Sequence, residues 1–170
     1  TNEILNAVAV EKDVDGLALD TTFDAPTPLA INWLLSGYNV DLRDKRIVIV
    51  GHGRLVGRPL EKLWLNSGLE PVVADIQTDD LSELTQLADV LVTATGKPGL
   101  ITADMVQADA IIVDAGVSTD SNGLIGDVAQ EVREMDGGKI TPVKGGVGPL
   151  TVAALFENVI IAARNSITDQ

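Results

Sequence analysis

Short apolar runs alternate with amphipathic segments along most of this 170-residue chain. The run 46–50 is apolar almost throughout, as expected for a strand that is buried on both faces of a parallel sheet. The same pattern predicts strands at 71–75, 90–93, 111–114 and 140–143, and helical segments at 56–66, 81–88, 102–106, 128–135 and 149–163. Strands that alternate with helices predict an α/β fold, a Rossmann-like doubly wound parallel sheet with helices on both faces.

The first 25 residues lack this alternation and are predicted to be a connector that packs against another element. Thr27 and Pro28 are typical of an N-cap and a first helical position, and this short helix is expected to end at Gly37. The expected organisation is a single domain with an N-terminal connector. Residues 1–37 form the connector and first helix, residues 38–148 the dinucleotide-binding Rossmann domain, and residues 149–170 the C-terminal closing helix.

A glycine-rich loop directly follows the first strand and opens a helix, which is the context that a dinucleotide fingerprint requires. Gly51 permits a tight turn, Gly53 lets the backbone approach a pyrophosphate, and Gly57 lets helix and strand pack closely. The helix start adds N–H groups and the positive end of a dipole. The whole loop is predicted to bind the cofactor: Gly51, His52, Gly53, Arg54, Leu55, Val56 and Gly57. A turn that binds nothing is the alternative.

Asp75 stands at the end of the second predicted strand, 18 residues after Gly57. A carboxylate in this position can accept hydrogen bonds from the ribose hydroxyls of an adenosine, and it repels a 2′-phosphate. A solvated aspartate at a strand end is the alternative interpretation.

Composition excludes several function classes. The formal net charge of -13 disfavours nucleic acid and anionic membrane surfaces as partners. The chain has no cysteine and one histidine, so disulfides and a multi-histidine metal site are excluded. No uninterrupted apolar run approaches the ~20 residues of a membrane span, so no membrane segment is expected.

Several segments resemble one family in the right order along essentially the whole chain. They are 11–16 (EKDVDG), 25–28 (APTP), 51–59 (GHGRLVGRP), 95–99 (TGKPG), 114–117 (DAGV), 126–128 (GDV) and, most distinctively, 140–151 (ITPVKGGVGPLT). The family is that of the bifunctional methylenetetrahydrofolate dehydrogenase/cyclohydrolases. The resemblance implies a cytoplasmic, dimeric enzyme of one-carbon metabolism and purine biosynthesis that takes tetrahydrofolate derivatives and uses NAD or NADP.

The resemblance also implies roles for individual residues. Asp15 corresponds to the carboxylate that holds the pterin, although an aspartate capping its own turn is the alternative. Further substrate-binding residues are Gly145, Gly146, Val147, Gly148 and Pro149. Further cofactor-binding residues are Thr95, Gly96, Lys97, Gly116, Val117 and Thr151. No metal site is implied.

The chain departs from the family in two respects. The tyrosine and lysine that the family carries at Y-x-x-x-K spacing are absent, because Leu42 lies four residues after Tyr38. No catalytic residue is therefore identified, an amino-terminal domain is missing, and the isolated chain is expected to be inactive. Typical members also carry Arg in place of His52 and His-Ser in place of Asp75 and Ile76, so NAD is expected to be preferred. Arg54 could still swing to a 2′-phosphate.

Two other functions stay open. The chain could be a module that binds NAD(H) without catalysis, which the missing tyrosine and lysine favour. It could also be the cofactor domain of another two-domain dehydrogenase, although that leaves the segment 141–151 unexplained.

Overall fold

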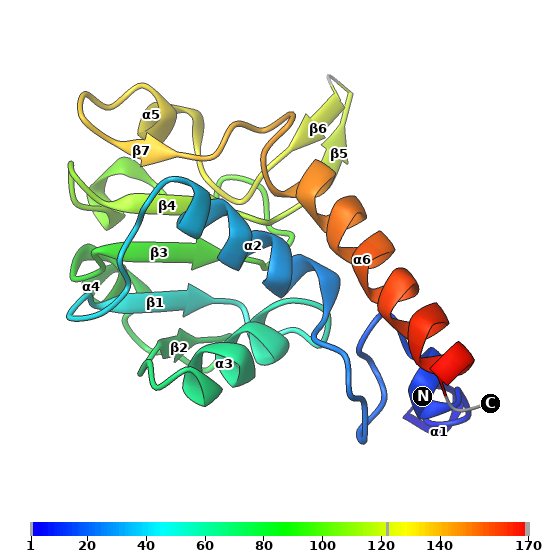
Figure 1. The fold of residues 1–170 in the computed structure, drawn as a ribbon. Coiled ribbons are helices and arrows are strands. Elements are labelled where there is room, and N and C mark those ends of the chain that lie inside the picture. The colour runs from blue at the N-terminus through cyan, green and yellow to red at the C-terminus, as the bar shows by residue number, and fades with distance from the viewer. Residues whose placement is uncertain (1, 122, 169–170) are drawn as a thin grey trace.

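Five parallel strands form the central sheet of the computed structural model, which describes residues 2–121 and 123–168 (Figure 1). The order across the sheet is β2-β1-β3-β4-β7. The strands are β1 (Ile47–Val50), β2 (Val72–Ala74), β3 (Val90–Thr93), β4 (Ile111–Asp114) and β7 (Lys139–Ile140). The predicted α/β class with a Rossmann-like parallel sheet is confirmed.

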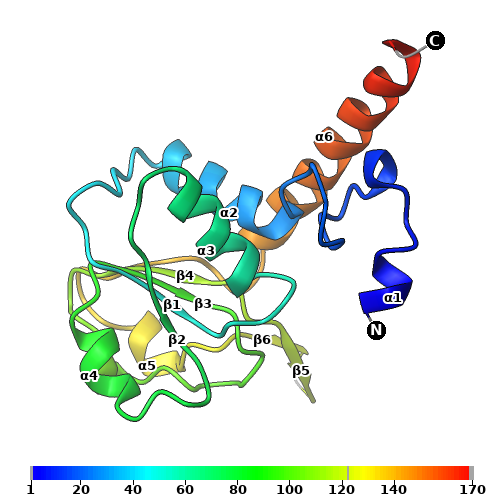
Figure 2. The same ribbon diagram turned by 90° about the horizontal axis from the view of Figure 1, so that it is seen from below.

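Helices cover both faces of this sheet (Figure 2). One face carries α2 (Pro26–Gly37), α3 (Gly57–Asn66) and the start of α6 (Val147–Thr168). The other face carries α4 (Leu81–Gln86), η2 (Ala103–Met105) and α5 (Gln130–Arg133). Strand residues alternate between two cores. Ile49 packs with α2 and α3, for example, while its neighbours Val48 and Val50 pack with the opposite layer.

Several element boundaries differ from the predicted ones. Helix α2 begins at Pro26 with Ala25 as its N-cap, two residues before the predicted N-cap Thr27 and first helical residue Pro28. Strand β2 ends at Ala74, so that Asp75 begins the following loop. Strand β7 has two residues where four were predicted, because Pro142 has no N–H to continue the ladder. Helix α6 begins two residues earlier than predicted and extends to Thr168.

Four further elements were not predicted. An antiparallel hairpin of β5 (Ser118–Asp120) and β6 (Gly123–Ile125) follows β4. The connector contains two short turns of helix, α1 (Asn2–Leu5) and η1 (Val10–Lys12). Each of these segments has only three or four residues, which is too few to show a clear period in the sequence.

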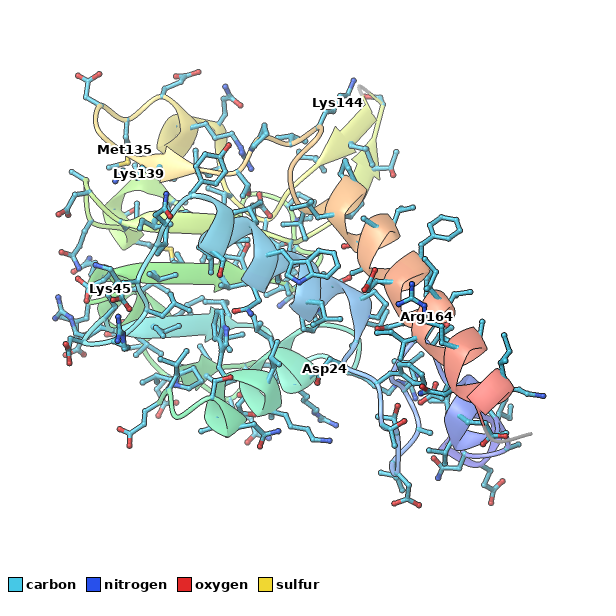
Figure 3. All side chains as sticks on the ribbon, in the orientation of Figure 1. Asp24, Lys45, Met135, Lys139, Lys144 and Arg164 are labelled. Carbon is cyan, nitrogen blue, oxygen red and sulfur yellow. The ribbon has the colours of Figure 1, made fainter. Side chains whose placement is uncertain are left out.

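Helix α6 fastens the connector to the domain. The side-chain amide of Asn158 is buried and donates to the carbonyl oxygens of Val14 and Asp24, at 2.8 and 2.9 Å. Figure 3 labels Asp24 on the connector, where it lies close to the helix. The connector therefore packs on an element more than a hundred residues away in the sequence, as its lack of a core of its own suggested.

The outer half of α6 projects beyond the sheet (Figures 1 and 2). Apolar side chains are exposed along most of the length of this helix. They include Val152, Phe156, Val159, Ile160 and Ile167, of which Phe156 is 63% exposed. By length and composition alone, residues Val147–Ile167 of α6 are apolar enough to cross a membrane, although Glu157 and Arg164 interrupt the apolar sequence. Its packing against α2 and its buried Asn158 are features of a helix that belongs to a folded domain.

Replacing Asn158 tests how the connector is held. Asn158→Ala leaves two carbonyl groups without their donor, so the free energy of unfolding should fall by about 1–3 kcal/mol. Ser166→Ala is the matched control, because it removes an exposed side-chain hydrogen bond from the same helix. Urea denaturation of both variants gives the comparison, and equal effects would contradict this role of Asn158.

Candidate functional site

The carboxyl ends of the parallel strands bring the glycine loop against two neighbouring strands. Gly51 has φ of +101°, and a Cβ at this position would lie 2.6 Å from the carbonyl oxygen of Ala94. A Cβ on Gly57 would overlap the carbonyl oxygen of Gly51. By contrast, nothing lies within 4 Å of a Cβ built on Gly53. Gly51 and Gly57 thus permit the close packing of loop and helix, while Gly53 leaves open space that a ligand can approach.

Helix α3 begins in this loop without a side-chain cap. Its N-cap residue is Val56, whose side chain cannot accept a hydrogen bond from the first turn. The ten-residue helix therefore presents the positive end of its dipole toward the loop. Together with the open space at Gly53, this arrangement has the local features of a pyrophosphate site.

The other members of the loop point in different directions. The Nε2 atom of His52 lies 2.7 Å from the Oε2 atom of Glu61, which is one turn into α3. Arg54 instead lines a pocket of about 280 Å³ between the connector and α3, together with Arg58 and Lys62. Leu55 is 61% exposed, and Val56 faces a different pocket. Arg54 thus lines a pocket that includes neither His52 nor Asp75.

Asp75 follows β2 beside the glycine loop. The N–H of Gly51 donates to the carbonyl oxygen of Ala74 at 2.8 Å, so the two loops are joined directly. The carboxylate of Asp75 is exposed and accepts a hydrogen bond from the N–H of Gln77 at 2.8 Å. Asp75 is thus a solvated aspartate just after the strand, as the alternative interpretation held, and it also caps its own turn. Its exposure still leaves it accessible to a ribose hydroxyl.

A pocket of about 420 Å³ lies between the end of β4 and the start of α6. It brings together predicted residues that are widely separated in the sequence, namely Val56, Gly116, Val117, Gly145, Gly146, Val147, Gly148, Pro149 and Thr151. Sequence reasoning missed Thr27, whose hydroxyl accepts a hydrogen bond from Thr151 at 3.4 Å, and Leu124 and Ile125 of the hairpin. The glycine signature and the loop after β4 therefore form one site.

The loop after β3 lies near this pocket but does not line it. The N–H of Lys97 donates to the hydroxyl of Thr95, and Gly96 has φ of +70°. The carbonyl oxygen of Gly96 accepts a hydrogen bond from the Ser118 hydroxyl at 2.8 Å. This contact joins the loop after β3 to the first strand of the hairpin. Thr95, Gly96 and Lys97 thus share the carboxyl edge of the sheet with the other predicted residues.

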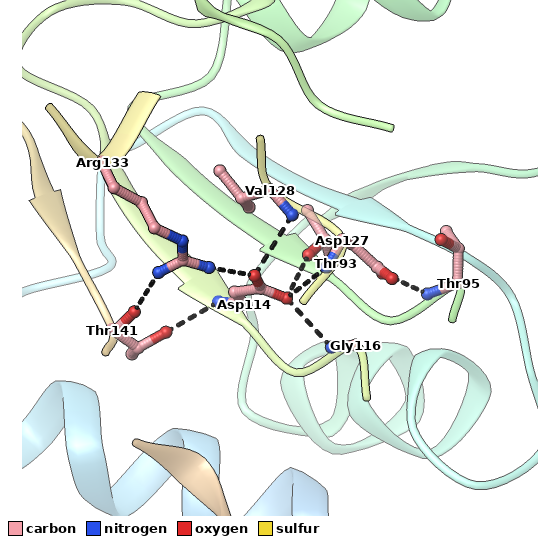
Figure 4. Close-up of polar contacts among 8 residues, drawn as sticks. All are labelled: Thr93, Thr95, Asp114, Gly116, Asp127, Val128, Arg133 and Thr141. Carbon is pink, nitrogen blue, oxygen red and sulfur yellow. Dashed lines mark hydrogen bonds and ion pairs between the residues drawn. The ribbon is translucent and has the colours of Figure 1, made fainter. Parts of the chain in front are cut away.

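A buried carboxylate organises these loops (Figure 4). Asp114 is at the end of β4, and its side chain pairs with the guanidinium of Arg133. One carboxylate oxygen also accepts hydrogen bonds from the N–H groups of Gly116 and Asp127, at 3.2 and 3.0 Å. The other accepts one from the N–H of Val128. A single side chain thereby fixes the loop after β4 and the segment after the hairpin.

A second carboxylate extends this network. Asp127 is 1% exposed, and its Oδ2 atom accepts a hydrogen bond from the N–H of Thr95 at 2.6 Å. No hydrogen-bond partner for its Oδ1 atom is found in the part of the chain that the structure describes. Burial raises the pKa of the Asp127 carboxyl. The hydrogen bond from Thr95 opposes that rise, and the charge of Asp114 adds to it.

Asp15 does not line any of these pockets. Its side chain is exposed, whereas Asp13 is buried and accepts hydrogen bonds from the N–H groups of Leu17 and Ala18. Asp13 thus shapes the connector turn and Asp15 stands free on its surface. Lys144, labelled in Figure 3, is exposed at the rim of the 420 Å³ pocket. Among residues 2–121 and 123–168, no cluster of His, Cys, Asp and Glu could hold a metal ion.

Comparison with known proteins agrees with this geometry. Residues 25–167 match the family described as tetrahydrofolate dehydrogenase/cyclohydrolase, NAD(P)-binding domain. The bifunctional protein FolD of Methanospirillum hungatei is 42% identical over 174 residues, covering 97% of this chain and 62% of that protein. The FolD protein of Helicobacter hepaticus is 40% identical, and there the chain spans 60% of the relative's length. The chain thus corresponds to only part of these relatives.

Solved structures give the same result. The bifunctional dehydrogenase/cyclohydrolase of Campylobacter jejuni superimposes with a TM-score of 0.89 at 39% identity, over 98% of this chain and 63% of that one. The Trypanosoma brucei enzyme, solved with NADP and an inhibitor, gives a TM-score of 0.86 at 29% identity, over 98% and 63% of the two chains.

The Asp114–Arg133 pair should contribute strongly to stability. Arg133→Ala leaves a carboxylate that is 3% exposed without its cation, so the free energy of unfolding should fall by about 3–5 kcal/mol. Arg43→Ala is the control, because it breaks an exposed ion pair with Asp41 and should change little. Chemical denaturation measures both. A loss in Arg133→Ala no larger than in the control would contradict the organising role of the pair.

Proposed function

Because the chain belongs to the tetrahydrofolate dehydrogenase/cyclohydrolase family through its NAD(P)-binding domain, we propose that it is the dinucleotide-binding part of such an enzyme. The parent enzyme oxidises 5,10-methylenetetrahydrofolate to the methenyl compound with NAD(P), and then hydrolyses this compound to 10-formyltetrahydrofolate. The observation that carries the proposal is the close packing of Gly57 on Gly51 beside open space at Gly53. This arrangement of the three glycines fits a dinucleotide, and larger residues at these positions would remove it.

Different loops would hold different parts of the dinucleotide. Gly53 and the start of α3 would hold the pyrophosphate, and His52 and Asp75 would hold the adenosine ribose. The 420 Å³ pocket would hold the nicotinamide, with Val117 as an apolar wall and Thr151 as a polar contact. Thr95, Gly96 and Lys97 would border the cofactor between these ends. A bound dinucleotide would supply the hydride acceptor for the one-carbon bridge of the folate.

The folate would contact the same 420 Å³ pocket on the side opposite to the nicotinamide. Gly145, Gly146 and Gly148, with Val147 and Pro149, give a backbone surface that a flat ring can approach closely. Asp15 holds the pterin through its exposed carboxylate, which requires the pterin to extend toward the connector. No group in this chain is assigned to proton transfer, so the catalytic lysine comes from the part of the relatives that the chain does not span.

The exposed apolar side chains of α6 mark where that missing part packs. Val152, Phe156 and Ile160 follow one another at intervals of four residues, so they lie along one side of the helix. A contiguous apolar strip of this kind is costly to leave in water. The amino-terminal domain is therefore the partner that covers it. We further infer a cytoplasmic homodimer, as the resemblance implies.

NAD is the preferred cofactor in this proposal. Asp75 is an exposed carboxylate beside the glycine loop, and His52 is paired with the carboxylate of Glu61. Both features disfavour the added negative charge of a 2′-phosphate. Arg54, which could have offset them, lines the pocket on the connector side of α3.

Dinucleotide binding by the chain is the direct test. Calorimetry should detect NAD with an affinity on the order of tenfold above that for NADP, the effect of one unfavourable charge contact near a surface. Gly53→Val should abolish binding of both without unfolding the chain, because its side chain meets only open space. Gly37→Val is the control, since that position is also open but lies in α2. Equal binding by the two variants would contradict the proposed pyrophosphate site.

A module that binds NAD(H) without catalysis is the second candidate, because no catalytic residue is assigned in this chain. An assay of methenyl absorbance separates the two. The chain alone should show no enzymatic turnover, and a protein extended by the missing domain should oxidise methylenetetrahydrofolate and hydrolyse the product. An inactive extended protein would favour the binding module. Rapid turnover by the chain alone would show that a catalytic group has been missed.

A further inference from the structure

We propose that Glu61 is a positioning residue for cofactor choice, which acts by fixing the hydrogen-bonding state of His52. The inference rests on the proposed binding of a dinucleotide at the glycine loop. It assigns a role to a side chain of α3 that lies outside the loop itself.

The contact between the two side chains is short and partly shielded. The distance from Nε2 of His52 to Oε2 of Glu61 is 2.7 Å, and the side chains are 32% and 30% exposed. A carboxylate only accepts hydrogen bonds, so the hydrogen atom of this contact resides on Nε2 of the imidazole. Glu61 thereby selects one of the two neutral forms of His52.

That selection determines what His52 offers to a ligand. With its hydrogen on Nε2, the neutral ring has only an acceptor, Nδ1, left for other partners. A ribose 2′-hydroxyl can donate to such an acceptor. The oxygens of a 2′-phosphate are acceptors and carry negative charge, so they find no donor on this ring.

The neighbouring groups reinforce this preference. Asp75, another acceptor, follows β2, and the hydrogen bond from Gly51 to Ala74 places its loop directly beside that of His52. The cations of this region, Arg54, Arg58 and Lys62, line the pocket on the connector side of α3. These basic residues thus line a pocket that includes neither His52 nor Asp75.

His52 is the only histidine in the chain, so its ring nitrogens can be observed without assignment ambiguity. Nitrogen-15 NMR at a pH where the imidazole is neutral should show the Nε2–H form in the unmodified chain. Glu61→Gln should give a mixture of both forms, because an amide can accept or donate. Glu70→Gln is the control. It makes the same chemical change at a residue that lines a separate groove with Leu42 and Val72, and it should leave the hydrogen of His52 on Nε2.

Calorimetry of the same variants measures cofactor choice. The ratio of NAD to NADP affinity should fall roughly three- to tenfold in Glu61→Gln, the size of one hydrogen bond, and stay constant in Glu70→Gln. An unchanged ratio in Glu61→Gln, or the Nδ1–H form in the unmodified chain, would overturn the role of Glu61. If the unmodified chain binds neither dinucleotide, the proposed function fails, and the role of Glu61 in cofactor choice fails with it.

Discussion

The burial of one negative charge at the end of β4 constrains most of the site. Asp114 is held by the guanidinium of Arg133, which also donates to the carbonyl oxygen of Thr141 at 2.8 Å. Removing both charges from water is costly, and the cost is offset only when every remaining hydrogen-bonding position has a partner. The N–H groups around Asp114 supply those partners. The loops at the carboxyl edge of the sheet therefore adopt the shape that satisfies this carboxylate.

This constraint reaches the loop after β3 and both walls of the 420 Å³ pocket. Asp127 is fixed through its N–H by Asp114, and its own carboxylate fixes Thr95. The N–H of Asp114 donates to the hydroxyl of Thr141, at the end of β7, where the glycine signature begins. The pocket walls formed by residues 114–117 and 142–148 thus share one anchor. Glycines at 116 and 126 are needed because a Cβ at either would collide with the carboxylates.

Much of this architecture could be predicted from the sequence because it depends on local patterns. The buried runs at β1 and β4 and the spacing of Gly51, Gly53 and Gly57 give the sheet and its loop. The Asp114–Arg133 pair could not be predicted in this way, since 19 residues separate its members and the strand and helix patterns do not show which side chains meet. The same holds for His52 and Glu61. Asp13 and Asp15 look alike in the sequence, and only the packing of the connector distinguishes the buried one from the exposed one.

We propose that the two buried carboxylates hold these loops in one shape before any ligand binds. Hydrogen exchange of the backbone amides of the free chain is the test. The two buried carboxylates accept hydrogen bonds from the N–H groups of Thr95, Gly116 and Val128. These amides should exchange as slowly as those of the central strands. Exchange as fast as at an exposed loop position such as Asp44, with protection appearing only after a dinucleotide is added, would contradict this role of the carboxylates.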